Sequence, residues 1–300
     1  IVDHARSLEV PVSPKPRIMY LAALILGLLV PFLIIYLKNL LNNKVRSHHD
    51  LESHLTNLPI IGELPKFTKS SAELIEKNDR SMMAEAFRIL QHNLQYLLVR
   101  TAEKSKGVSI MVTSSIKGEG KTFVSFNLGL TLAHSGKKVL LVGADLRNPQ
   151  MQRFIPESRS FSGLSDYLVD PGRDLQELIK ASGFHEKLEI MASGSMPPNP
   201  AELLGREDLR DLIEKLESRY DYVIIDSAPT MPVVDSFLIT EHVDLNLFVI
   251  RADYTDRKLL DFVLHAKQEE KLGDLGPVSY THLRAHETVL DLVCRLLLEK

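Results

Sequence analysis

The stretch that decides the fold is residues 108–133, VSIMVTSSIKGEGKTFVSFNLGLTLA. A short apolar run is followed at once by a glycine-containing turn and then by a helical pattern of apolar residues. Residues 115–122, SIKGEGKT, match the phosphate-binding loop pattern, with Ser115 in the place of the first glycine. Because a strand precedes the motif and a helix follows it, the sequence predicts a nucleotide site here.

The residue types in this motif suit phosphate binding. Gly118 and Gly120 let backbone N–H groups turn inward around phosphate oxygens, and the N-terminus of the following helix adds its positive dipole. Lys121 can reach the β- and γ-phosphates, and the Thr122 hydroxyl can ligate Mg²⁺. The predicted cofactors are therefore ATP and Mg²⁺. The predicted nucleotide-binding residues are Ser115, Lys117, Gly118, Glu119, Gly120, Lys121 and Thr122.

Two aspartates follow apolar runs that look like buried strands. Asp145 comes just after VLLVGA, and Asp226 ends YVIID. In a parallel sheet the carboxyl ends of the strands share one edge, which is also the edge of the phosphate-binding loop. An aspartate after a strand is more often a turn or cap, but beside such a loop we expect both carboxylates to face one Mg²⁺. The predicted metal ligands are Thr122, Asp145 and Asp226.

Five short apolar runs alternate with helical stretches and are candidates for buried strands. Such runs predict a parallel sheet that is covered on both faces. The expected fold class is α/β, a doubly wound, mostly parallel sheet of the P-loop NTPase type, preceded by one transmembrane helix. The candidate strands are residues 108–113, 138–142, 188–191, 222–225 and 245–250.

Residues 18–37, IMYLAALILGLLVPFLIIYL, contain no charged residue. Twenty helical residues span roughly 30 Å, the thickness of the hydrocarbon core of a bilayer. Gly27 and Pro31 would weaken a soluble helix but are tolerated in a membrane helix. A buried core helix or the apolar region of a signal peptide is the alternative, and both are usually shorter. We therefore expect a transmembrane span.

The composition is that of a folded chain. Of 300 residues, 44% are hydrophobic and 25% are charged, with a formal net charge of −3. This balance excludes a disordered tail and argues against nucleic acid as a partner. The single cysteine, Cys294, cannot form an internal disulfide.

The segment between the span and the first strand has two parts. Residues 38–80 are polar and mixed in sign, and we expect a cytoplasmic linker that docks on the next domain through Ile60, Ile61 and Leu64. Residues 81–103 carry apolar side chains at the spacing of an amphipathic helix. The expected organisation is a proline-rich end (1–17), a transmembrane helix (18–37), a linker (38–80), a P-loop domain (81–277) and a C-terminal segment (278–300).

Several motifs together resemble the bacterial tyrosine kinases (BY-kinases) of the Wzc-like polysaccharide co-polymerase group. The resemblance runs from about residue 10 to 275. It rests on the phosphate-binding loop, Asp-Leu-Arg (145–147), GLSDYL (163–168), SGSMPPNPAELL (193–204) and IIDSAP (224–229).

This resemblance implies ATP-dependent autophosphorylation on tyrosine and control of capsular or exopolysaccharide chain length and export. It implies that Lys121 neutralises the transferred phosphate, that Thr122 and Asp226 hold Mg²⁺, and that Asp145 is a candidate base. The catalytic residues that the resemblance implies are therefore Lys121, Asp145 and Asp226. It also implies a bacterial inner-membrane protein in which residues 1–17 end an extracytoplasmic region and residues 81–277 form a cytoplasmic kinase domain that is incomplete at its C-terminus. The implied partners are further copies in a ring, the polysaccharide polymerisation and export machinery, and a cognate phosphotyrosine phosphatase.

Glu85 and Arg88 resemble the start of the motif with which this family forms rings. Outside that context, the pair would be an exposed i, i+3 ion pair worth a few tenths of a kcal/mol. Two positions depart from the family. Gly143 stands where the second acidic motif usually has its first aspartate, and Gln91 replaces the last arginine of the ring motif.

Two alternative functions remain open. A partition or division-site ATPase of the same P-loop class is favoured by Lys117 directly before Gly118, but the predicted membrane span and Asp145-Leu-Arg speak against it. A non-enzymatic co-polymerase scaffold with a degenerate site is opposed by the intact Lys121, Thr122, Asp145 and Asp226.

The last 23 residues, 278–300, resemble the translation of a common transposon-based sequencing adapter. We therefore expect the natural chain to stop near Pro277, so that His282, His286 and Cys294 carry no function. The family's tyrosine-rich tail would then be missing, and we also expect the last core strand to be absent.

Overall fold

The computed structural model describes most of the chain, in the ranges given at the end of this paragraph. His282, His286 and Cys294 lie outside these ranges, as does most of the adapter-like segment 278–300. The described residues are 16–46, 51, 60–65, 73–99, 106–231, 235–269 and 275–281.

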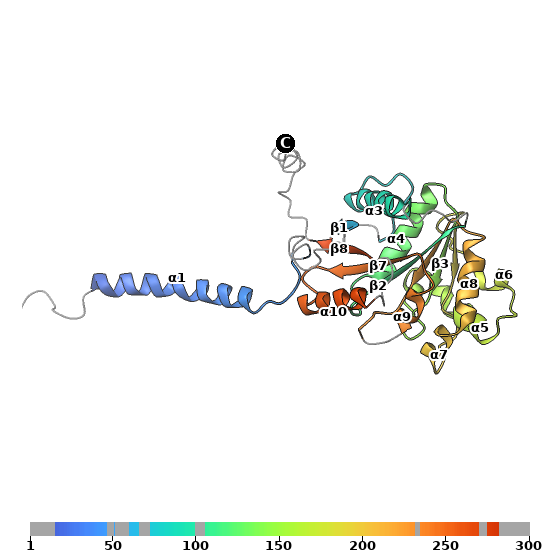
Figure 1. Cartoon of the computed structure of the whole chain (residues 1–300). Helices are drawn as coiled ribbons and strands as arrows, with labels where there is room; N and C mark the ends of the chain where they lie inside the picture. Colours follow the sequence, from blue (N-terminus) through green and yellow to red (C-terminus); the bar gives the residue numbers. More distant parts are fainter. Residues whose placement is uncertain are drawn as a thin grey trace, which may run out of the picture. The chain divides into compact units, whose positions relative to one another are not determined.

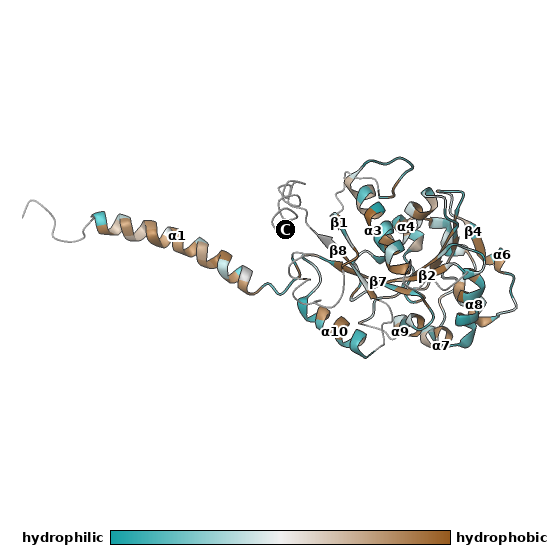
Figure 2. Cartoon of the chain, turned by 45° about the horizontal axis from the view of Figure 1, so that its top comes forward, coloured by the Kyte–Doolittle hydropathy of each residue, from teal (hydrophilic) through white to brown (hydrophobic). Residues whose placement is uncertain are grey.

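The chain forms two compact units, residues 1–43 and residues 44–300. The first contains helix α1 (Pro16–Leu40), in which residues Arg17–Lys38 are long and apolar enough to cross a membrane (Figure 2). This is the helix expected at residues 18–37. The second unit holds the sheet, and it includes residues 44–80, which the sequence suggested to be a linker.

An eight-stranded sheet forms the centre of the second unit (Figure 1). Its order is β1-β8-β7-β2-β6-β3-β5-β4, and every neighbouring pair is parallel except β4 with β5. The predicted fold class is thus confirmed. The strands are β1 (Gly62–Pro65), β2 (Val108–Ser114), β3 (Val139–Gly143), β4 (Ile179–Ala181), β5 (Leu188–Met191), β6 (Tyr222–Asp226), β7 (Leu245–Arg251) and β8 (Leu275–Thr281).

Helices cover both faces of this sheet because successive side chains of a strand point to opposite sides. In β2, Ile110 and Val112 pack with the face that carries α3 and α4, whereas Met111 packs on the opposite face. The helices are α3 (Met82–Val99), α4 (Lys121–His134), α5 (Leu164–Val169), α6 (Leu175–Leu178), α7 (Pro200–Leu204), α8 (Glu207–Glu217), α9 (Asp235–Thr240) and α10 (Arg257–Gln268), with short 3₁₀ turns at Met151–Arg153 and Pro156–Ser160.

The five strands expected from the sequence are all present, to within a residue at either end. Three others escaped the apolar-run criterion. Strand β4 has three residues, β1 reads GELP, and β8 reads LGPVSYT, so proline or glycine interrupts the last two. At Gly276 of β8 a Cβ would overlap the Ile61 side chain, so the close approach of β1 requires glycine there.

The expectation that the last core strand is absent is wrong. Strand β8 pairs with β7 on one side and β1 on the other, and Ile61 N donates to Pro277 O at 2.9 Å. Its last residues, from Val278, belong to the adapter-like segment. Val, Tyr and Thr have high strand propensity whatever their origin, and the free edge of β7 is available for pairing.

Ile60, Ile61 and Leu64, through which the sequence predicts docking on the following domain, contact the cores on the two faces of the sheet. Ile61 and Leu64 are buried in the core that α3 and α4 form with the sheet, and Ile60 packs against the core beside α10. Asn93 Nδ2 on α3 donates to Ile61 O at 2.7 Å.

A substitution at Phe87 tests the packing of α3. Phe87 is fully buried, and its ring centroid lies 6.1 Å from that of Phe123 on α4. We expect Phe87→Ala to lower the free energy of unfolding of the second unit by about 3–5 kcal/mol, measured by urea denaturation of the purified chain. Ile89→Ala, on the exposed side of the same helix, is the control and should change it by less than about 0.5 kcal/mol. Equal effects would contradict this packing.

Candidate nucleotide site

The candidate site begins where β2 ends. Strand β2 stops at Ser114, α4 starts at Lys121, and residues 115–120 form the loop between them. Gly118 and Gly120 have φ values of 91° and 99°, in the left-handed region that favours glycine. Gly120 is also the residue that caps α4. The two predicted glycines therefore allow the loop to turn back onto the helix N-terminus.

Lys121 lies in the first turn of α4 with its side chain buried. Its Nζ donates to Ser114 Oγ at 3.2 Å. Burial lowers the pKa of Lys121, and the nearby carboxylates of Asp226 and Asp145 oppose that shift. A lysine cation thus lies between the end of β2 and the two predicted aspartates.

The two aspartates come together through the pairing of β3 with β6. Gly143 is the register partner of Asp226, and the amides of Ala144 and Asp145 both donate to Asp226 O, at 2.8 and 3.1 Å. These bonds hold the loop after β3 against the end of β6. The Asp226 carboxylate also accepts hydrogen bonds from Thr122 and, at 3.3 Å, from Ser125 Oγ. Thr122, Asp145 and Asp226, predicted as metal ligands, therefore share one site.

Burial changes the charge balance of this site. It raises the pKa of Asp226 to about 6, against the hydrogen bond from Thr122. Burial also raises the pKa of Asp145, against the hydrogen bond that Asn148 N donates to Asp145 Oδ1 at 2.9 Å. Two desolvated carboxylates beside a desolvated lysine form a site that a bound cation would complete.

Glu119 and Lys117 differ from the other predicted loop residues in where their side chains lie. Glu119 is fully buried, and its carboxylate accepts hydrogen bonds from Ile116 N at 2.9 Å and from the Thr255 hydroxyl. Burial raises the pKa of Glu119. Lys117 is exposed, and its carbonyl accepts a hydrogen bond from Tyr254 Oη at 2.9 Å.

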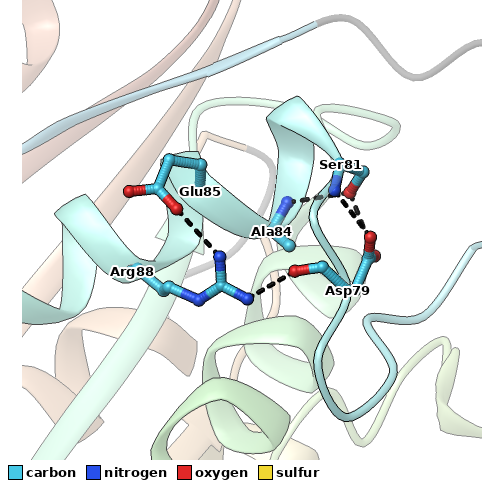
Figure 3. Close-up of polar contacts among 5 residues, drawn as sticks. All are labelled: Asp79, Ser81, Ala84, Glu85 and Arg88. Atoms are coloured by element: carbon cyan, nitrogen blue, oxygen red, sulfur yellow. Dashed lines mark hydrogen bonds and ion pairs between the residues drawn. The ribbon is translucent and has the colours of Figure 1, made fainter.

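Glu85 and Arg88 lie on the exposed side of α3 and pair with each other. Their Oε2 and Nη1 atoms are 2.8 Å apart, and Arg88 Nη2 also donates to Asp79 O (Figure 3). At the start of the helix, Ser81 Oγ accepts from Ala84 N at 3.1 Å. The i, i+3 pair that the sequence suggested is therefore formed within one chain.

Sequence reasoning missed Ser125 and the ion-pair partner of Arg147. Ser125 follows Lys121 at the i+4 spacing on α4, a signal that could have been read. Arg147 forms a two-pronged ion pair with Asp235, whose carboxylate is 2% exposed, with N–O distances of 2.6 and 3.0 Å. Nothing in the sequence around Asp235 points to that partner, 88 residues away along the chain.

The sheet and the loop define a P-loop nucleotide-binding domain. The family model of the AAA domain matches residues 108–254. The kinase domain of the Escherichia coli tyrosine kinase Etk superposes with a TM-score of 0.71 at 27% identity, over 82% of this chain and 97% of that one. The BceF tyrosine kinase domain superposes with a TM-score of 0.66 at 26% identity, over 79% and 99%.

The sequence comparisons agree with the structural ones. The tyrosine-protein kinase Etk of Escherichia coli K12 is 30% identical over 299 residues, 93% of this chain and 40% of the relative. Wzc of Salmonella typhi is 29% identical over 268 residues, 84% and 36%. A protein named as a candidate tyrosine kinase in the cps region of Klebsiella pneumoniae is 30% identical over 291 residues, 92% and 39%.

The chain belongs to the family of bacterial tyrosine kinases that includes Wzc and Etk. It spans about two fifths of the length of these curated relatives. The resemblance drawn from the sequence motifs is thus confirmed.

The raised pKa of Asp226 predicts a pH-dependent stability. Because this pKa lies above the unfolded value of 3.8, folding favours the protonated form, and stability falls as pH rises from about 4 to 6. Asp226→Asn cannot ionise, so its stability relative to the parent chain should rise over that window by up to about 3 kcal/mol. Thermal unfolding from pH 4 to 7.5, without nucleotide, measures the difference. A difference that is constant with pH would contradict the buried, destabilised carboxylate.

Proposed function

We propose that this chain carries the catalytic domain of an ATP-dependent protein-tyrosine kinase that autophosphorylates on tyrosine. The observation that supports this most is the joint placement of Lys121, Thr122, Asp145 and Asp226 at the carboxyl edge of the sheet. Family membership supports it independently, since the relatives above are named tyrosine-protein kinases.

The residues present fit a Mg²⁺–ATP complex. Ser115 Oγ is fully buried and, among the described residues, has no hydrogen-bond partner, as expected of a group that lines a phosphate cradle. Thr122 and Asp226 would hold Mg²⁺, an ion that prefers oxygen ligands, and the loop amides with Lys121 would hold the phosphates. Bound Mg²⁺–ATP supplies the phosphoryl group and neutralises part of its charge.

In this proposal each side chain has a definite task. Lys121 stabilises negative charge on the transferred group. Asp145 accepts the proton of the attacking tyrosine hydroxyl, and because burial raises the pKa of its carboxyl group, the Asp145 carboxylate is a stronger base than that of an exposed aspartate. Gly143 has no side chain and supplies no second carboxylate beside Asp145. A larger residue at position 143 would be crowded, because its Cβ would lie 2.6 Å from Ser193 Oγ.

The wider role follows from the relatives. We propose that the protein regulates capsular or exopolysaccharide chain length and export, because one relative is named for a cps region. With α1 crossing the bacterial inner membrane, the kinase unit would lie in the cytoplasm, where ATP is available. The proposed partners are the polysaccharide machinery, a cognate phosphotyrosine phosphatase and further copies arranged in a ring.

Phosphotyrosine formation tests the kinase activity directly. We expect the full-length protein to become labelled on tyrosine with ATP and Mg²⁺, and Lys121→Met to reduce labelling about 100-fold or more because the transferred charge loses its counterion. Lys106→Met, an exposed lysine just before β2, is the matched control and should label normally. ATP hydrolysis without phosphotyrosine would favour a P-loop ATPase, and neither activity would favour a scaffold.

The ring proposal makes a separate prediction about α3. The double substitution Glu85→Ala and Arg88→Ala should lower the molecular mass of the assembly, measured by light scattering in detergent. It should leave the unfolding free energy within about 0.5 kcal/mol, because both side chains are exposed. The matched control removes Arg210 and Glu214, an exposed i, i+4 pair on α8. An unchanged mass, or an equal loss in the control, would contradict a role of this pair in assembly.

A further inference from the structure

The turn between β7 and α10 contacts three consecutive residues of the phosphate-binding loop. Tyr254 Oη donates to Lys117 O at 2.9 Å, and Arg251 Nη1 donates to Gly118 O at 2.8 Å. The Thr255 hydroxyl bonds the Glu119 carboxylate. We call the side chains of Arg251, Tyr254 and Thr255 the loop brace.

Two of these bonds fix the direction of backbone amides. In a trans peptide unit the C=O and the following N–H point in opposite directions. Tyr254 holds the Lys117 carbonyl, and this turns the amide of Gly118 the other way. Arg251 holds the Gly118 carbonyl and does the same for the amide of Glu119. A phosphate cradle needs such consecutive amides turned toward one point.

The loop depends on outside support at this place. Gly118 is left-handed at φ 91°, and glycine is the residue that loses most conformational freedom on folding. A Cβ at Gly118 would lie 2.9 Å from Tyr254 Oη, so the brace is closely packed on the loop. The contact thus restricts one of the two left-handed glycines of the phosphate-binding loop.

The brace is itself held in a fixed turn. Arg251 N donates to Thr255 Oγ1 at 3.0 Å, and Thr255 N donates to Arg251 O at 2.9 Å. The Arg251 guanidinium lies 5.1 Å from the centre of the Tyr254 ring. From the other side, Val45 N donates to Thr255 O at 2.9 Å and Val45 O accepts from Asp253 N at 2.7 Å. Thr255 and Val45 are fully buried.

We propose that Arg251 and Tyr254 are positioning residues for the phosphates of the nucleotide, which they orient through the carbonyls of Lys117 and Gly118. The proposal concerns phosphate binding and does not require that the phosphoryl group be passed to tyrosine. It applies equally to ADP and to inorganic pyrophosphate, because the brace acts on the cradle.

Titration calorimetry with ADP and with pyrophosphate, each with Mg²⁺, tests this on the full chain in detergent. We expect Tyr254→Phe to weaken both ligands by the same factor, about 3- to 10-fold, as for one lost hydrogen bond. Arg251→Ala should have a similar effect, and Arg251→Lys should restore part of the affinity. The melting temperature without ligand should not change, because Tyr254 is partly exposed and keeps its ring.

Tyr96→Phe, at an exposed tyrosine of α3, is the matched control and should bind both ligands normally. Unchanged affinity in Tyr254→Phe and Arg251→Ala would overturn the proposal. So would weaker ADP binding with normal pyrophosphate binding, which would assign Tyr254 to the base, or a parent chain that binds neither ligand. A parent chain that binds both ligands but forms no phosphotyrosine, either on itself or on an added tyrosine-rich peptide, would overturn the kinase proposal and leave the role of the loop brace intact.

Discussion

The pairing of β6 with both β2 and β3 is the constraint on which the rest of the structure depends. Asp226 is the register partner of Val112 on one side and of Gly143 on the other. That double pairing sets the loop after β2 and the loop after β3 beside one carboxylate. Because the three strands are parallel, their carboxyl ends meet at one edge. Helix α4 adds its N-terminus and Lys121 to the same edge.

Burial then gives the site its chemistry. The sheet is covered on both faces, so Lys121, Asp145 and Asp226 are largely removed from water. Desolvation disfavours the charged form of each group. It therefore raises the pKa of the two aspartates and lowers the pKa of Lys121. A nucleotide phosphate with its metal ion would compensate all three charges at once.

The central part of the fold was readable from the sequence because its signals are local. Apolar runs marked β2 and β6, and the glycine spacing marked a loop whose φ values only glycine adopts easily. Strands β1 and β8 could not be predicted in this way, because both contain proline and glycine and both form by pairing with segments that are distant in the sequence. The contacts of Arg251 and Tyr254 with the loop span more than 130 residues of sequence, and no short-range pattern encodes them.

A crystal structure of the chain with ADP and Mg²⁺ would test the central claim most directly. The account places the phosphates within hydrogen-bond distance of the amides of residues 118–122 and the metal ion beside Thr122 and Asp226. A nucleotide bound elsewhere, or a metal ion remote from Asp226, would contradict it.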